Sequence, residues 1–165
     1  MSELVVHPLK PVYNKNSRVL VLGTMPSPKS RECGFYYSHP QNRFWRILAE
    51  LYHSPLPQTN NEKEALLLQN HIALWDVLKS CQICGADDAS IRSPEPNDIA
   101  GLLAKTRIRA VATTGTKAAT LYRRLCRQST GVDAIALPST SPANCRHYTY
   151  EKLLDAYRIL TDYTG

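Results

Sequence analysis

The chain has 165 residues, of which 43% are hydrophobic and 21% charged, a balance typical of a globular protein with a core of ordinary size. No apolar run approaches the length of a membrane-spanning helix, which excludes that class of protein. Twenty Lys and Arg against fourteen Asp and Glu give a formal net charge of +6, and this excess of cations suits a polyanionic partner.

Strands and helices are expected to alternate along the chain. Residues 1–16 are polar and predict a surface arm, and the polar stretch 79–96 is expected to be mostly loop. Short apolar runs predict four buried strands, at residues 18–22, 72–77, 108–113 and 134–137. Spacing and caps predict helices over residues 41–52, from Asn60 or Asn61 to 68, over 98–105 after Asn97, over 116–127, and after Thr149.

This alternation predicts one α/β domain, in which a mostly parallel sheet of four strands lies between two helical layers. Two helices have a clear buried face. The first places Phe44, Ile47, Leu48 and Leu51 together, and the last does the same with Leu153, Leu154, Tyr157 and Leu160.

Three loops follow the carboxyl ends of the predicted strands and are rich in Ser, Thr, Asn and Pro. They are the long loop after Leu22, the turn at 113–115, and residues 138–144. Ligands of open parallel sheets bind beyond these ends, where the strand order reverses. The first loop is too long and too aromatic to be a simple connection or a disordered segment. We therefore expect the three loops to enclose a binding pocket.

The five cysteines are odd in number and follow no basic leader, so we expect free thiols and a cytoplasmic protein. Cys81 and Cys84 have half the spacing of a zinc site, but no second pair of ligands completes it. We accordingly expect neither a metal nor a cofactor.

Four strings of residues together resemble the uracil-DNA glycosylase superfamily, and within it the hypoxanthine-DNA (DNA-deoxyinosine) glycosylase branch. They are Gly-Thr-Met-Pro-Ser from Gly23, Tyr-Tyr-Ser-His-Pro-Gln-Asn-Arg-Phe-Trp up to Trp45, Ala-Leu-Trp-Asp-Val-Leu-Lys-Ser-Cys up to Cys81, and Leu-Pro-Ser-Thr-Ser-Pro-Ala-Asn up to Asn144. The resemblance implies a monomeric, metal-free α/β/α enzyme that hydrolyses the bond between a deaminated base and deoxyribose in DNA. Such repair takes place at the nucleoid of a bacterium or in the nucleus of a eukaryote.

The resemblance also implies roles for particular residues. The catalytic Asn of that branch corresponds to Asn42, and residues 139–144 correspond to a motif that approaches the damaged strand. The acidic or amide residue usual just behind the first Gly is absent, since Thr24 and Met25 stand there. Relatives often carry Asn before the Gly that ends the third strand, where this chain has Thr114, which offers one hydroxyl in place of an amide.

Recognition of such a substrate requires the damaged nucleotide to be flipped out of the duplex, and phosphate contacts and stacking offset that cost. The candidate DNA-binding residues are Lys29, Arg43, Lys117, Ser139, Ser141, Asn144 and Arg146. The candidate base-binding residues are Gly23, Thr24, Met25, Pro26, Ser27, Tyr37 and Thr114. Tyr37 is a candidate for stacking on the base, and the alternative is that it only packs the loop.

Cleavage leaves negative charge on the departing base, so donors near Gly23 and on Ser27 are expected to stabilise it. Asn42 does not titrate usefully, but its carbonyl could hold a water and aim it at the sugar; the alternative is a helix cap. His39 could protonate or hydrogen-bond the base, or could simply bond the backbone of its loop. The loops carry no carboxylate pair, because Glu32 stands alone, and this disfavours associative acid–base hydrolysis.

The leading hypothesis is a monofunctional DNA glycosylase that removes hypoxanthine, with uracil or xanthine as further substrates. One alternative is a non-catalytic nucleic-acid-binding domain on the same fold. Another is a small nucleotide or ester hydrolase, although no Gly-x-Ser-x-Gly elbow surrounds Ser141.

Overall fold

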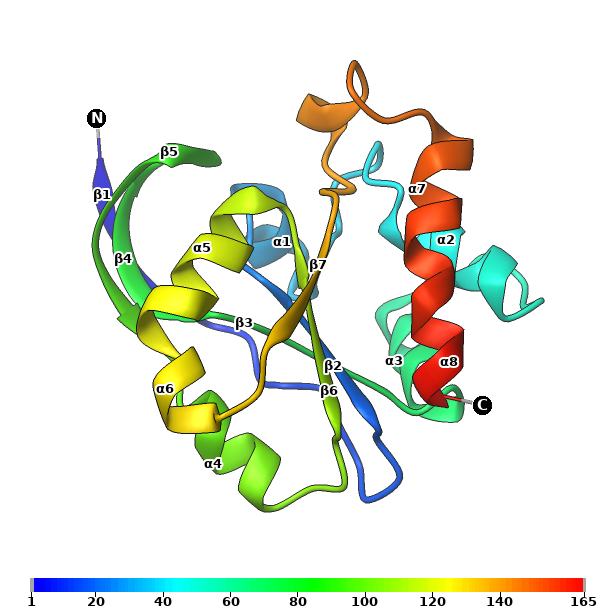
Figure 1. The fold of residues 1–165 in the computed structure, drawn as a ribbon. Coiled ribbons are helices and arrows are strands. Elements are labelled where there is room, and N and C mark those ends of the chain that lie inside the picture. The colour runs from blue at the N-terminus through cyan, green and yellow to red at the C-terminus, as the bar shows by residue number, and fades with distance from the viewer. Residues whose placement is uncertain (1, 165) are drawn as a thin grey trace.

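The centre of the computed structural model, which describes residues 2–164, is a parallel sheet with the strand order β3-β2-β6-β7 (Figure 1). Its strands are β2 (Val19–Gly23), β3 (Ile72–Asp76), β6 (Ala110–Thr114) and β7 (Ala134–Leu137). Each strand lies within two residues of the expected one. The predicted central, parallel, four-stranded sheet is therefore confirmed.

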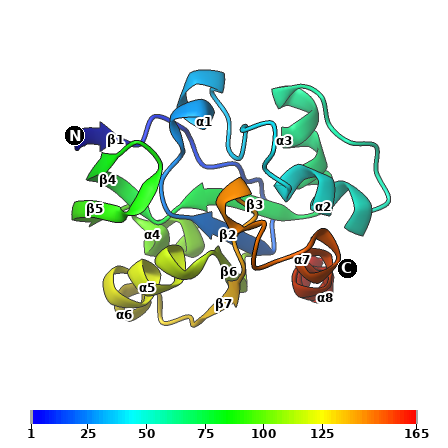
Figure 2. The ribbon, with the colours of Figure 1, turned by 90° about the horizontal axis from the view of Figure 1, so that it is seen from above.

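Helices cover both faces of this sheet (Figure 2). One group comprises α2 (Phe44–Leu51), α3 (Asn60–Gln69), α7 (Tyr150–Tyr157) and α8 (Thr161–Thr164); the other comprises α4 (Ile99–Ala104), α5 (Thr116–Leu125) and α6 (Arg127–Thr130). Strand β2 serves both layers, because Val19 and Val21 belong to one buried cluster and Leu20 and Leu22 to the other. The α/β/α layering expected from the sequence is confirmed.

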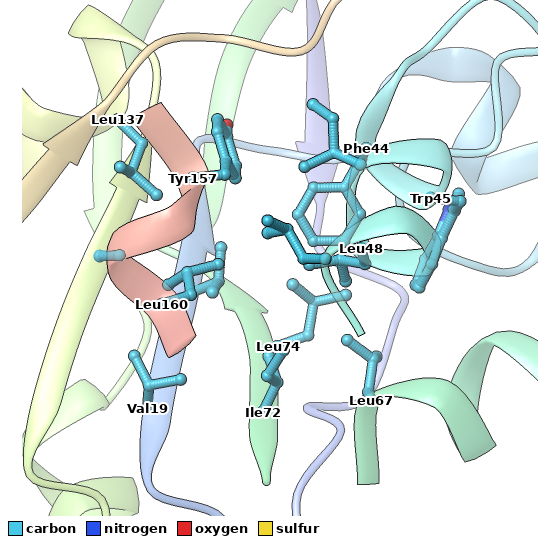
Figure 3. Close-up of a cluster of buried hydrophobic side chains, with 14 of the residues drawn as sticks. Val19, Phe44, Trp45, Leu48, Leu67, Ile72, Leu74, Leu137, Tyr157 and Leu160 are labelled. Atoms are coloured by element: carbon cyan, nitrogen blue, oxygen red, sulfur yellow. The ribbon is translucent and has the colours of Figure 1, made fainter. Parts of the chain in front are cut away.

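The larger cluster lies between the sheet, α2 and the C-terminal helices (Figure 3). The predicted face of α2 is buried as expected, with Phe44, Ile47 and Leu48 fully inaccessible to solvent. The predicted face of the last helix is buried too. Each such side chain contributes about 1.5–3 kcal/mol through the area it removes from water, and this fixes α2 against the sheet. The loop before α2 is thereby anchored at its downstream end.

A second sheet, which was not expected, lies beside the first. It has the order β1-β4-β5 and consists of β1 (Glu3–Val6), β4 (Leu78–Cys84) and β5 (Asp87–Pro96), all antiparallel. The prediction that residues 79–96 are mostly loop is wrong. Three register shifts interrupt the β4–β5 pairing, so burial does not alternate regularly and the period of two is hidden in the sequence.

The expected surface arm at residues 1–16 is also wrong over most of its length. Val5 of β1 is buried, and Val12 forms a bridge with Leu74 of β3 through two backbone hydrogen bonds of 2.9 Å. Along β1 the side chains alternate between the two faces, because Leu4 and Val6 are exposed and Val5 is buried. The N-terminal segment is thus part of the framework around the strand ends.

Several helix ends differ from the expected ones. Helix α2 begins at Phe44 and not at 41, and a short helix α1 (Pro28–Cys33), capped by Ser27, stands inside the long first loop. Thr59 caps α3 in a capping box with Glu62, and Asp98 replaces Asn97 as the cap of α4; α5 ends at Leu125. Thr149 caps α7 as predicted.

The strand order reverses between β2 and β6, because the chain passes from β2 to β3 on one side and then crosses to β6 on the other. Beyond the carboxyl ends of these strands, the loop after β2, the turn after β6 and the loop after β7 converge, with the 3-10 helix η1 (Pro142–Asn144) in the last of them. This is the switch-point crevice in which ligands of such sheets bind.

Candidate active site

A cavity of about 320 Å³ opens at the carboxyl ends of the parallel strands. All of the candidate base-binding residues line it: Gly23, Thr24, Met25, Pro26, Ser27, Tyr37 and Thr114. Asn42 and His39 line it as well, as do Ser139 and Ser141 from the loop after β7. Its volume falls in the range of small-ligand sites. Segments far apart in the sequence therefore meet around one space.

The floor of the cavity is built around Gly23, the last residue of β2. A Cβ atom at Gly23 would lie 2.5 Å from Oδ1 of Asp76, 3.0 Å from the Tyr37 hydroxyl and 3.5 Å from Oγ1 of Thr114. No side chain fits there without moving these groups. Glycine at the end of the first buried strand thus lets three polar groups from three other segments approach one point.

Tyr37 forms one wall. Its ring stacks on Phe44 of α2 with 4.1 Å between centroids and an 18° interplanar angle, and its backbone adopts a left-handed conformation with φ of 52°. The Tyr37 hydroxyl lies 2.9 Å from Oγ1 of Thr114. Burial, reinforced by the nearby Asp76 charge, raises the pKa of Tyr37 well above its usual range, so the phenol keeps its proton at neutral pH.

Asn42 lies where the loop enters α2, and its carbonyl oxygen is fully used. Oδ1 accepts hydrogen bonds from the Phe44 amide at 3.0 Å and from Oγ1 of buried Thr140 at 2.7 Å. A carbonyl oxygen has two lone pairs, so both are engaged. The Asn42 amide nitrogen has no protein partner among residues 2–164. Asn42 is therefore presented to the cavity as a donor.

His39 stands at the mouth of the cavity. It is exposed, its Nδ1 accepts from the Gln41 amide at 3.1 Å, and its carbonyl accepts from the Asn42 amide at 2.9 Å. Nδ1 is thereby the acceptor nitrogen, which leaves Nε2 as the position able to donate to an incoming group. The expected bond of His39 to the backbone of its loop is present, and its contact with a base stays a prediction.

The hydroxyl of Ser27, a candidate donor to the base, forms hydrogen bonds within its own loop. Its Oγ accepts from the Ser30 amide and donates to the Ser30 hydroxyl, both at 3.2 Å. The Ser30 hydroxyl also accepts from the Ser38 amide at 3.1 Å. These bonds shape the first loop around α1, so Ser27 contributes to the form of the cavity wall.

The candidate DNA-binding residues divide into two groups. Ser139 and Ser141 line the cavity, whereas Lys29, Arg43, Lys117, Asn144 and Arg146 do not. Arg43 is turned inward: Nη1 donates to the Tyr148 carbonyl at 2.6 Å, and Nε and Nη2 are buried with no hydrogen-bond partner in the described part of the chain, 2–164. Its cation is therefore not free for a phosphate, and it links α2 to the loop after β7.

The other three candidate cations follow residues that line the cavity by two or three positions in the chain. Lys29 is half-buried and 3.8 Å from Glu32, Lys117 is half-buried on α5, and Arg146 is exposed. Asn144 donates from its side chain to the Ser139 carbonyl at 2.9 Å, which holds the loop after β7 in shape. Of the candidate cations, Lys29, Lys117 and Arg146 retain side chains accessible to a polyanion.

Sequence reasoning missed two carboxylates that line the cavity from outside the loops, Asp76 at the end of β3 and Asp88 in β5. Asp76 is buried and accepts from Nε2 of His7 at 2.7 Å. The sequence did carry one signal for Asp76, which directly follows the apolar run Ile-Ala-Leu-Trp of a buried strand. Buried carboxylates are rare without a partner, so a carboxylate at this position indicates a specific role. The second sheet, and with it Asp88, was hidden by the bulges.

Within residues 2–164 no group of three or more His, Cys, Asp or Glu side chains is arranged to hold a metal ion. Cys81 is buried and Cys84 half-buried in β4, and neither joins such a group. None of the helices described is long and apolar enough to cross a bilayer.

Comparison with known proteins agrees with this architecture. The family model described as the uracil DNA glycosylase superfamily matches residues 10–161. A protein named hypoxanthine DNA glycosylase from Methanosarcina acetivorans is 36% identical over 137 residues, which cover 82% of this chain and 85% of the relative. Another of that name, from Methanosarcina barkeri, is 39% identical over 89 residues, covering 53% of this chain and 56% of the relative.

A solved structure agrees at the level of the fold. The solution NMR structure of a candidate uracil DNA glycosylase from Methanosarcina acetivorans superposes with a TM-score of 0.80 at 29% identity, over 96% of this chain and 99% of that one. The family match spans almost the whole chain, and the cavity lies at the switch point of the matched fold. The chain belongs to the uracil DNA glycosylase superfamily, on the side represented by the hypoxanthine DNA glycosylases, and it is a DNA glycosylase.

Proposed function

We propose that this enzyme releases hypoxanthine from DNA by hydrolysis of the N-glycosidic bond, with uracil and xanthine as further candidate substrates. The observation that carries the proposal is the buried carboxylate of Asp76 on the floor of a cavity of about 320 Å³. The names of the relatives point the same way. A flipped nucleotide would enter past His39 and Ser141, with its base edge toward Asp76.

The floor offers a means of distinguishing deaminated bases. Deamination converts N1 of adenine from a hydrogen-bond acceptor into the N1–H donor of hypoxanthine, and uracil and xanthine carry comparable N–H groups. An ionised carboxylate only accepts hydrogen bonds. Asp76 would therefore accept a hydrogen bond from the N–H group of a deaminated base. With adenine, the N1 acceptor would face the carboxylate acceptor of Asp76 and no hydrogen bond could form, a mismatch that costs about 1–3 kcal/mol.

The wall opposite would hold the plane of the base. Phe44 supports one face of the Tyr37 ring, and Tyr37 lines the cavity. A base stacked against Tyr37 would gain about 1–3 kcal/mol, which helps to offset the cost of flipping. The Thr114 hydroxyl fixes Tyr37 at 2.9 Å. In this arrangement Thr114 supports the stacking residue and does not itself need to pair with the base.

Charge on the departing base would be stabilised by backbone donors in the turn after β2. The carbonyls of Gly23 and Thr24 accept from the amides of Val77 and Leu78 at 2.8 and 3.1 Å, which holds this turn rigid. Thr24 and Met25 line the cavity, and their backbone amides would serve there as preorganised donors. One such donor changes a rate by about 10²–10³.

The attacking water would be held by Asn42. Since Oδ1 is occupied, the expected role of the carbonyl passes to the amide nitrogen, which donates to the water oxygen and leaves a lone pair for the sugar carbon. The base leaves with the electron pair of the broken C–N bond, and it takes up the proton that the water loses as the C–O bond forms. A dissociative reaction needs the water placed more than it needs a strong base. No lysine lines the cavity within residues 2–164, so a Schiff-base lyase step has no nucleophile there, in keeping with a monofunctional enzyme.

The test uses duplexes and single strands that each carry one deoxyinosine, deoxyuridine, deoxyxanthosine or unmodified deoxyadenosine. After incubation, alkali cleaves any abasic site, and free base is measured separately. We expect release of hypoxanthine, cleavage only after alkali, and no release of adenine. Salt-dependent binding without release of any base would contradict the proposal and favour the non-catalytic alternative.

A further inference from the structure

His7 reaches the floor of the cavity from the N-terminal segment, 69 residues away from Asp76 along the chain. Its backbone amide donates to the Lys79 carbonyl at 2.8 Å, which ties the segment to β4. The side chains of His7 and Asp76 are only 2% and 5% exposed. The family model matches residues 10–161, so His7 lies before the matched region.

The hydrogen bonds of His7 define its tautomer. The Leu9 amide donates to Nδ1 at 3.3 Å, so this nitrogen carries no proton and the ring proton sits on Nε2. Nε2 then donates to Oδ2 of Asp76 at 2.7 Å. The imidazole also packs against Tyr36, whose hydroxyl donates to the Lys10 carbonyl at 2.7 Å. The ring is held from both sides and cannot exchange its two nitrogens without breaking these contacts.

The other carboxylate oxygen is the one that faces the cavity. Oδ1 of Asp76 is the atom nearest to the position that a Gly23 side chain would take, and it has no hydrogen-bond partner among residues 2–164. The main chain of Asp76 is fixed as well, because its carbonyl accepts from the Asn97 side chain at 3.0 Å. One oxygen is thus anchored and the other is left as a free acceptor.

We propose that His7 is a positioning residue for base selection, which holds the Asp76 carboxylate so that Oδ1 alone meets the edge of the base. This inference rests on the proposed function. Without the Nε2–H group, Oδ2 would have no partner inside the protein, and the carboxylate would rotate or recruit water. The acceptor that distinguishes hypoxanthine from adenine would then lose its fixed direction.

The first experiment compares His7→Leu with His7→Gln. Leucine removes the donor, whereas glutamine places an amide nitrogen near the position of Nε2 and can still donate to Oδ2. Single-turnover rates and KM are measured on deoxyinosine and deoxyadenosine duplexes. We expect His7→Leu to lower the hypoxanthine-to-adenine rate ratio about tenfold or more, and His7→Gln to restore most of it.

Val5→Ala is the matched control, because it weakens the same N-terminal segment at a buried residue that does not line the cavity. It should lower the thermal midpoint and leave the rate ratio unchanged. Equal losses of selectivity in Val5→Ala and His7→Leu, or an unchanged ratio in a folded His7→Leu enzyme, would overturn the proposal. Failure of the wild-type enzyme to release any deaminated base would instead refute the proposed function.

A second variant does not depend on the folding of the His7 variants. In Asp76→Asn, His7 still offers its N–H and requires an acceptor, so the amide oxygen should turn to His7 and the amide nitrogen to the cavity. The side chain at position 76 would then offer the base a hydrogen-bond donor in place of the acceptor Oδ1. We expect the preference for hypoxanthine over adenine to fall at least tenfold. If the preference stays at the wild-type value, His7 does not determine which atom faces the base.

Discussion

The hydroxyl of Thr140 donates a 2.7 Å hydrogen bond to Oδ1 of Asn42 and so joins two loops that are 98 residues apart in the chain. Thr140 is 1% exposed, and its carbonyl accepts from the Arg43 amide at 3.2 Å. The loop after β7 is therefore coupled to the start of α2 at two points. This coupling decides which end of the Asn42 amide faces the cavity.

Replacing Thr140 by Val keeps the shape of the side chain and removes this donor. We expect kcat to fall about five- to tenfold with little change in KM, because the loss of one hydrogen bond loosens the Asn42 amide without touching the substrate. Single-turnover kinetics on a deoxyinosine duplex measures this. Thr140→Ser retains the hydroxyl and should remain near wild type; a serine variant as impaired as the valine variant would contradict the assignment.

Asn42 itself can be tested by separating its two ends. Asn42→Asp keeps the oxygens that accept from Phe44 and Thr140 but removes the N–H donor, whereas Asn42→Ala removes both. We expect both variants to lose about 10²-fold or more in rate, because in the proposed mechanism the amide nitrogen of Asn42 holds the water. Only the alanine variant should lose stability, by about 1 kcal/mol, through the lost contact at the start of α2.

The outcome for Asn42→Asp distinguishes two mechanisms. Activity at or above the wild-type level would mean that an oxygen at this position activates the water, and that the Thr140 bond is exchanged during the reaction. Thermal unfolding of the three proteins, measured alongside the rates, separates catalysis from folding.

Gly23→Ala should damage the floor of the cavity. The added methyl group would lie 2.5 Å from Oδ1 of Asp76, which is held in place by His7 and cannot easily retreat. We expect a loss of stability of about 1–3 kcal/mol from overpacking, together with a larger loss of kcat/KM on deoxyinosine than on deoxyuridine, since the purine needs more room. Equal kcat/KM losses on the two substrates would place the base away from Gly23.

Alkaline pH should destabilise the protein through its buried phenols. Burial raises the pKa of Tyr37 and of Tyr157 well above their usual value, and burial raises the pKa of Cys126 to about 11. In the unfolded chain these groups release their protons near pH 10 for tyrosine and near pH 9 for cysteine, while the folded state keeps them. Their contribution to stability is complete below those values and is lost as the pH rises.

The slope follows from linkage: each tyrosine that stays protonated only when folded costs about 1.4 kcal/mol per pH unit above pH 10. Urea unfolding between pH 8 and pH 11 measures it. Tyr37→Phe should make the decline shallower, because it removes one phenol whose pKa is raised by burial. An identical slope in Tyr37→Phe would show that Tyr37 ionises in the folded state.

Much of the fold could be predicted because it depends on local patterns. Each parallel strand begins with a short apolar run, which in β2 continues over 19–23, and the buried face of α2 repeats at helical spacing. Both patterns can be recognised without knowledge of their partners. The three loops were identified by their place after the strands. The helix ends are harder to predict. Asn97 and Asp98 are both favourable N-cap residues, so the sequence alone does not say which of them caps α4. In the folded chain the Asn97 side chain donates to the carbonyls of Asp76 and Leu78 instead.

What could not be predicted depends on pairing between distant segments. The β4–β5 hairpin carries bulges that disguise its periodicity, and β1 is a strand only because β4 lies beside it. The partnership of His7 with Asp76 has no local signature at all. The orientation of Asn42 likewise follows from Thr140, whose own sequence neighbourhood suggests only a turn.

The segment that carries His7 precedes β2, the first strand of the parallel sheet, and it reaches the cavity through the contact of His7 with Asp76. With His7 in the proposed role, substrate preference would be partly separable from the scaffold that performs the cleavage. A handful of exchanges at the start of the chain could retune which lesion is accepted while the parallel strands, their helices and the hydrolytic loops remain as they are.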